Sequence, residues 1–363
     1  MIRIFTKRTH FLIATLALLG NLHAAEPDKS ALDGARDAAR KGDFPKAMEL
    51  LKAEAAKGNA EAANALGELS LGGRGMKASP AEAARWFQQG VDASYPAAML
   101  NLGMLLRKGA DGVSADPDKA NFLIHGAAEE GFAPAQVACG QLAEAGGEDK
   151  GDMPGARAWY EKAAAQGNAD GLLAISRFLD NGLGGPKDHE KALEACRGAA
   201  AAGSLIALNE IGVRYQKGQG VPIDPTAAVG YFTMAAQGGL PAAHVNLGNC
   251  YEVGKGVFQD LSQTFAHYSA AAKQGFGPAQ YLLGTLFEAG KGTAADPLKA
   301  YINYSLGGAN GVDAAKKKAE EIKAKLTPEQ LAEAAKVIAG GGSVAPAEAP
   351  KAKPATPAPK PKK

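Results

Sequence analysis

The sequence predicts an all-α fold, a solenoid of stacked antiparallel helix pairs. The first observation is a position that recurs within a helix at spacings of 36, 37, 36, 36, 36 and 36 residues. This position is Gly67, Gly103, Gly140, Ser176, Gly212, Gly248 and Gly284 in repeats 1 to 7. The second observation is a helix-start signal in every repeat, and the third is a glycine that closes nearly all of them. A fixed period of this length indicates repeated supersecondary units, so chain length counts repeats and not globular domains.

The N-terminal segment, residues 1–24, is typical of a cleavable signal peptide. Basic residues precede the apolar run 11–19, and small residues follow at Ala24 and Ala25. The run is shorter than the roughly 20 residues that a bilayer-spanning helix needs. We therefore expect a periplasmic or secreted protein with no transmembrane span after cleavage.

Residues 25–58 are predicted to form a short lead-in and an N-terminal capping helix pair. Helical patterns run over 31–41 and 44–57, with a Gly-Asp pair between them. Asp43 lies 36 residues before Ser79, which places this pair in phase with the repeats that follow. We expect it to cap the array.

Residues 59–311 hold the seven repeats, each built from two helices. In repeat 5 the first helix carries Ala207, Ile211-Gly212 and Tyr215, at spacings of four that place them on one helix face. Glycine inside a helix costs about 1 kcal/mol relative to alanine, so its recurrence predicts that another helix backbone comes too close for a Cβ. A glycine six residues later, such as Gly218, is predicted to end the helix in a left-handed conformation.

The second helix of each repeat begins at an N-cap residue, followed by proline in four repeats. The capping side chain accepts an otherwise unpaired backbone N–H, and proline has no N–H to leave unpaired. The N-cap residues are Ser79, Asp116, Asp152, Asp188, Asp224, Asp260 and Asp296. The helix closes at a position predicted to be a turn. This position is Gly58, Ser94, Gly131, Gly167, Gly203, Gly239, Gly275 and Gly311 along the chain.

Residues 312–339 lack the repeat signature and are predicted to form two charged capping helices, the second opened by a capping box at Thr327. Residues 340–363 form an Ala-, Pro- and Lys-rich tail that buries too little apolar surface to fold. Loss of the signal peptide lowers the formal charge from +2 to −1, and five lysines against Glu348 give the tail a local +4. The remaining acidic body argues against binding to nucleic acid.

These residues resemble the Sel1-like repeats, a branch of the tetratricopeptide-type α-solenoids. The resemblance rests on the pattern of Ala207, Ile211-Gly212, Tyr215, Asp224 and Tyr231-Phe232, repeated over roughly residues 31–339. It implies a right-handed superhelix of helix pairs that acts as an adaptor in protein complexes. For exported bacterial members it implies roles in the cell envelope or secretion.

No catalytic or metal-binding set is predicted, so we expect neither enzyme activity nor a cofactor. The histidines show no metal-ligand spacing, and His244 and His267 lie on different helices of repeat 6. Some relatives carry a β-lactamase label, but the chain has no S-x-x-K string. Its three cysteines lie in different repeats and are predicted to be buried small residues. These are Cys139, Cys196 and Cys250.

Positions that differ between repeats are candidates for function, because the repeat itself does not require them. The first variable series directly follows the repeat glycine: Glu68, Met104, Gln141, Arg177, Val213, Asn249 and Thr285. The second variable series lies three residues before it: Asn64, Leu100, Val137, Leu173, Asn209, Val245 and Tyr281. By the resemblance both series face a concave groove that binds a peptide or a partner helix, the alternative being solvated or half-buried positions. The candidate binding residues are Gln141, Arg177, Asn209, Val213, Asn249 and Tyr281.

The sequence favours a non-catalytic adaptor of the cell envelope that binds a partner protein or peptide. The alternative is a structural envelope protein whose basic tail contacts an anionic wall or membrane. An enzyme acting on envelope substrates has no sequence feature to support it.

Overall fold

The structure, a computed structural model, describes residues 31–146 and 151–340. Within these ranges every helix is an α-helix, and the one pair of bridged residues, Ala110 and Val113, belongs to a loop. The all-α architecture is confirmed. The predicted signal peptide and the tail from residue 341 onward lie outside the described residues. None of the described helices has the length and apolar character needed to cross a bilayer.

The chain divides into two compact units, residues 1–175 with 183–185 and residues 176–182 with 186–363. Unit 1 contains α2 (Ala31–Arg40), α3 (Phe44–Ala56), α4 (Ala60–Gly72), α5 (Pro80–Asp92), α6 (Pro96–Lys108), α7 (Pro117–Glu129), α8 (Ala133–Ala145), α9 (Met153–Ala165) and the start of α10 (Ala169–Asn181). Unit 2 contains the rest of α10, α11 (His189–Ala201), α12 (Leu205–Lys217), α13 (Pro225–Gln237), α14 (Pro241–Val253), α15 (Leu261–Ala272), α16 (Gly277–Ala289), α17 (Pro297–Ala309), α18 (Asp313–Lys323) and α19 (Pro328–Ala339).

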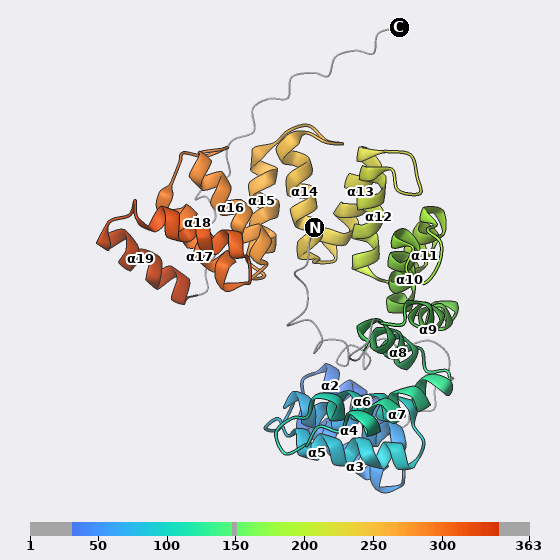
Figure 1. The fold of residues 1–363 in the computed structure, drawn as a ribbon. Helices are drawn as coiled ribbons and strands as arrows, with labels where there is room; N and C mark the ends of the chain where they lie inside the picture. The colour runs from blue at the N-terminus through green and yellow to red at the C-terminus, as the bar shows by residue number, and fades with distance from the viewer. Residues whose placement is uncertain (1–30, 147–150, 341–363) are drawn as a thin grey trace. The chain divides into compact units, whose positions relative to one another are not determined.

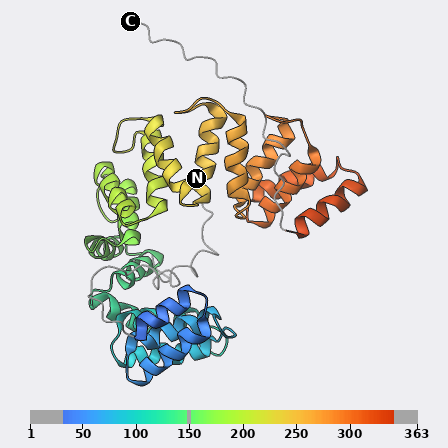
Figure 2. The same ribbon diagram turned by 180° about the vertical axis from the view of Figure 1, so that it is seen from behind.

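Within each unit, the helices pack mainly against their neighbours in sequence, except that α19 packs against α17. In unit 2 this holds from α11 through α18, and α12 to α16 follow one another side by side in both views (Figures 1 and 2). In unit 1, first helices of adjacent repeats also contact each other directly, α4 with α6 and α6 with α8. Contacts between neighbours alone are what a repeat array predicts.

All seven predicted N-caps of the second helices are confirmed. Asp224, for example, accepts a hydrogen bond at 2.9 Å from the backbone N–H of Ala227, three residues ahead. Ser79 caps α5 in the same way. The capping box at Thr327 is also present, with Gln330 as its second member.

The prediction that the seven first helices end in left-handed glycines is right in four repeats and wrong in two. In repeat 4, Gly182 also has a positive φ, 68°. Gly218 has φ 73° and ψ 37°, inside the left-handed region, and its equivalents in repeats 1, 6 and 7 match it. Gly109 and Gly146 have positive φ but ψ of 167° and 176°. Repeat 2 has one extra loop residue, and the bridge between Ala110 and Val113 requires an extended chain after Gly109.

The repeat glycine is required by an aromatic ring and not, as the sequence suggested, mainly by a neighbouring backbone. A Cβ on Gly212 would lie 2.6 Å from the Phe232 ring, which comes from the second helix of the same repeat. Rings of Phe87, Tyr160, Tyr268 and Tyr304 occupy the equivalent space in repeats 1, 3, 6 and 7. Each of these rings is almost fully buried, so the glycine–aromatic contact forms the centre of repeats 1, 3, 5, 6 and 7. In repeat 2 the side chain of Ile124 takes the place of the ring.

Candidate interaction surface and its supporting contacts

The first variable series is never buried. Gln141 on α8, Arg177 on α10 and Asn249 on α14 are exposed, and the other four members are half-buried. Val213 is among the half-buried ones and packs against the apolar cluster around Phe232. The position after the repeat glycine therefore presents changeable side chains on the first helices.

The second variable series is packed and never exposed. Asn209 is only 7% exposed, and its Oδ1 accepts a hydrogen bond at 2.7 Å from Asn246 of the next repeat. Tyr281 is half-buried, with its ring 5.6 Å from that of Tyr304. Asn209 links its repeat to the next one, and Tyr281 packs within its own repeat, so both support the surface more than they form it.

A polar cluster in unit 1 contains an asparagine pair like that of Asn209 and Asn246, together with a carboxyl group. Asn101 donates to Asn64 at 2.9 Å and to Glu68 at 3.2 Å, and Asn64 also donates to Glu68. The second carboxyl oxygen of Glu68 is buried without a hydrogen-bond partner. Burial outweighs the two asparagine hydrogen bonds and raises the pKa of Glu68 to about 7.

Three carboxylates in unit 2 each accept a hydrogen bond from a cationic side chain further along the chain. They are Asp180, Glu252 and Glu288, and each lies four residues after the repeat glycine or its serine replacement. We call them the junction carboxylates. Glu252 pairs with Lys291 at 2.6 Å, and Glu288 pairs with Lys318 at 3.2 Å. Both also accept from a buried tyrosine of their own repeat, Tyr268 or Tyr304. The hydrogen bond from Tyr304 is the main reason that the pKa of Glu288 is lowered.

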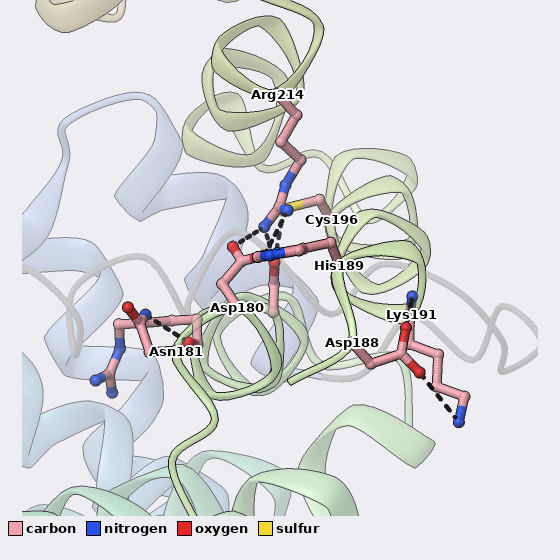
Figure 3. Close-up of polar contacts among 9 residues, drawn as sticks. Asp180, Asn181, Asp188, His189, Lys191, Cys196 and Arg214 are labelled. Atoms are coloured by element: carbon pink, nitrogen blue, oxygen red, sulfur yellow. Dashed lines mark hydrogen bonds and ion pairs between the residues drawn. The ribbon is translucent and has the colours of Figure 1, made fainter. Parts of the chain in front are cut away.

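The third junction carboxylate, Asp180, belongs to a differently built site (Figure 3). Arg214 of the next repeat is 3% exposed, and it donates to Asp180 at 2.9 Å and to Ser176 at 2.6 Å. Ser176 lies 3.1 Å from the sulfur of Cys196, and His189 lies 2.9 Å from Asp180. Burial opposes the charge of Arg214, but the Asp180 hydrogen bonds keep its pKa above the ordinary value.

The composition of this site follows from two simultaneous departures from the repeat. Ser176 replaces the repeat glycine, and Cys196 stands 20 residues later, where Phe232 stands after Gly212. The smaller cysteine leaves room for the guanidinium of Arg214, whose equivalent in repeat 7 is Leu286. Since Ser176 and Cys196 are 2% and 1% exposed, neither nucleophile is open to a substrate. The site joins repeats 4 and 5.

The sequence did not predict this site, although Ser176 is the one member of its series that is not glycine. The site could have been predicted from three residues that differ together from the other repeats, at positions 176, 196 and 214. The sequence also did not predict that His244 and His267 lie in contact. Their Nδ1 atoms are 3.1 Å apart. Among the described residues, no group of three or more His, Cys, Asp or Glu side chains is placed to hold a metal ion. The three cysteines are buried, as predicted.

Comparison with known proteins identifies the repeats. The Sel1 repeat model matches seven consecutive segments, at 60–95, 96–132, 133–168, 169–203, 205–240, 241–276 and 277–312. The chain is also 32% identical over 147 residues to chitin synthase regulatory factor 3 of Schizosaccharomyces pombe. That match covers 40% of this chain and only 16% of the yeast protein.

Two bacterial proteins are among the solved structures that share the fold. The chain is 28% identical to c5321, a protective antigen of uropathogenic Escherichia coli with an SLR fold, with a TM-score of 0.64 over 86% of this chain and 68% of that one. It is 26% identical to a Sel1 repeat protein from Oxalobacter formigenes, with a TM-score of 0.61 over 85% of this chain and 99% of that one. Sel1 repeat proteins generally act as non-catalytic scaffolds for protein interactions. With seven matched repeats and this fold, the chain belongs to the Sel1 repeat family.

Proposed function

We propose that this protein is a non-catalytic adaptor of the bacterial cell envelope, exported through residues 1–24, that binds a partner protein or peptide on its first helices. The observation that carries the proposal is the difference between the two variable series. Packing uses the second series, whereas the first series stays at least partly accessible and carries unrelated side chains. A scaffold that keeps its packing constant can vary such positions without losing the fold.

The chemistry of the surface suits a polar, extended partner. In unit 2 it carries the cation of Arg177 and the amide of Asn249, with Val213 between them in sequence. The Asn249 side chain already accepts from Tyr268 at 2.6 Å, which restricts how the amide presents its N–H₂ group. In unit 1, Gln141 presents a second amide. Amides that are held in place bind a peptide with less loss of side-chain entropy than free ones.

Affinity purification of the mature chain from periplasm tests the proposal. The variant Gln141→Glu/Arg177→Glu/Asn249→Asp keeps the size of each surface residue similar and retains the acceptor for Tyr268. We expect it to recover at most about one tenth of the partner that the wild type recovers, because charge reversal in an interface costs more than 1 kcal/mol. Arg85→Glu, at an exposed residue of a second helix, is the matched control and should recover the partner in full. Equal recovery by all three proteins would refute the proposed surface.

The basic tail motivates a second candidate, a structural envelope protein held to an anionic wall or membrane by its lysines. A chain ending at Gly342 separates the two functions. An adaptor without its tail keeps its partner, whereas a tail-dependent wall protein no longer fractionates with the envelope. Loss of envelope fractionation together with retained fold would favour the second candidate.

A further inference from the structure

Repeat 6 contains a pair of histidines that repeat packing does not require. His244 on α14 and His267 on α15 face each other with Nδ1 atoms 3.1 Å apart and ring centroids 5.4 Å apart. Repeat 5 provides an internal comparison, because Leu208 and Tyr231 occupy the equivalent positions. Both histidines therefore replace residues that already serve the fold.

The stacking of repeat 5 is retained in repeat 6 although the ring has changed. Tyr215 stacks on Tyr231 with centroids 5.5 Å apart and an interplanar angle of 13°. Tyr251 stacks on His267 at 5.6 Å and the same angle. The stack fixes the plane of the His267 ring, and the substitution adds ring nitrogens at a position where tyrosine would pack equally well.

We infer that His244 and His267 form a two-nitrogen site for a first-row divalent metal ion, with copper(II) the preferred one. Two nitrogens bound at about 2.0–2.1 Å to one ion lie about 2.8–3.4 Å apart for bond angles between 90° and 109°. The observed 3.1 Å falls within this interval. Imidazole suits copper, nickel and zinc, and copper(II) binds most tightly to a given set of nitrogen ligands.

Access and charge agree with this assignment. Both side chains are half-buried, so neither is sealed inside the packing. Burial lowers the pKa of His244 and of His267, and the neighbouring His244 lowers that of His267 further. Neutral imidazole is the form that binds metal, and burial favours that form.

Copper(II) titration of the full, untagged chain at pH 7 tests the inference by calorimetry and electron paramagnetic resonance. The variant His244→Leu/His267→Tyr recreates the arrangement of repeat 5, so the fold has a precedent in the same chain. We expect the wild type to bind one equivalent at least about tenfold more tightly than this variant, with coupling to two nitrogens in its spectrum. His189→Gln removes a histidine elsewhere and should leave that binding unchanged.

Two outcomes would overturn the inference. The first is an identical copper isotherm for the wild type and the repeat-5-like variant, in which case the pair is only a hydrogen bond from one imidazole to the other. The second is a wild-type spectrum without coupling to two nitrogens. Circular dichroism of both proteins establishes that any difference in binding does not come from loss of helix.

Discussion

Ser94 departs from the rest of the series that closes the second helices. It has φ of 53° and is the one non-glycine residue with positive φ among the described residues. The other seven members of the series are glycines with φ between 74° and 92°. A side chain in this region costs roughly 1 kcal/mol because its Cβ approaches the following carbonyl.

We predict that Ser94→Gly raises the free energy of unfolding by about 0.5–1 kcal/mol, since relief of strain outweighs the greater freedom of the unfolded chain. Urea denaturation followed by circular dichroism measures the change. Gly131→Ser is the matched reverse, because a Cβ there meets no atom within 4 Å and only the backbone conformation is at issue. It should lose about 1 kcal/mol. A destabilised Ser94→Gly protein would contradict this account.

Glu68 makes stability depend on pH. Its pKa is raised from 4.5 to about 7 in the folded protein, so folding favours the neutral carboxyl. The stability that Glu68 contributes is complete below pH 4.5 and is lost as pH rises through 7. The full loss amounts to about 3 kcal/mol.

We predict that Glu68→Gln removes this pH dependence. Between pH 5 and pH 8 the free energy of unfolding of the wild type should fall by about 2–3 kcal/mol more than that of the variant. Urea denaturation at both pH values, with Glu61→Gln as a control for loss of an acid on the same helix, measures the difference. Parallel pH profiles for the wild type and Glu68→Gln would rule out a neutral Glu68 carboxyl in the folded protein.

At the scale of helices, the junction carboxylates show how one repeat is held to the next. Glu252 and Glu288 combine a tyrosine hydroxyl from their own repeat with a lysine from further along the chain. Asp180 has Cys196 in place of the tyrosine and binds the buried Arg214 instead. The junction carboxylate is therefore held in one of two ways, by a tyrosine and a lysine or by a buried arginine. Each arrangement requires its own residues at the positions that contact the carboxylate.

We predict that Arg214→Leu lowers the free energy of unfolding by about 2–3 kcal/mol. This single change introduces the leucine of repeat 7 without the other residues that accompany it there. Asp180 and Ser176 then stay partly or fully buried without the guanidinium. Arg85→Leu, at an exposed arginine of a second helix, should change stability by less than about 0.5 kcal/mol.

The rebuilt variant Ser176→Gly/Asp180→Glu/Cys196→Tyr/Arg214→Leu provides a further check. It restores the glycine, tyrosine, glutamate and leucine of repeat 7 together, so it should recover part of the loss. Thermal and urea denaturation of the three proteins measure this. A rebuilt variant less stable than Arg214→Leu would mean that the four positions do not act as a set.

How far the sequence predicts these features depends on how far apart the partners lie. Asp224 caps a backbone N–H three residues away, so its role follows from local spacing. Arg214 and Asp180 are 34 residues apart, and their pairing follows only from the helix register and the small volume of Cys196. The repeat glycine was recognised, but its partner was not, because spacing alone does not distinguish a ring from a backbone.

At the scale of the whole molecule, the repeat signature is nearly all used for packing. Caps, glycines and buried rings account for the regular positions, and the sequence predicted two variable series for function without distinguishing them. Burial distinguishes them: Asn209 is bonded to Asn246, whereas Arg177 and Asn249 are exposed. The difference depends on how adjacent first helices approach each other, which the sequence of a single repeat does not contain.

Site-specific photo-crosslinking tests the central claim, that the partner binds on the first helices, most directly. A photoreactive residue is placed singly at Gln141, Arg177 or Asn249, and as controls at Arg85 or Glu194 on second helices, all of them exposed. The account predicts that the first three positions crosslink to one envelope protein and that the two controls do not. Crosslinks from Arg85 and Glu194, with none from the first-helix positions, would contradict it.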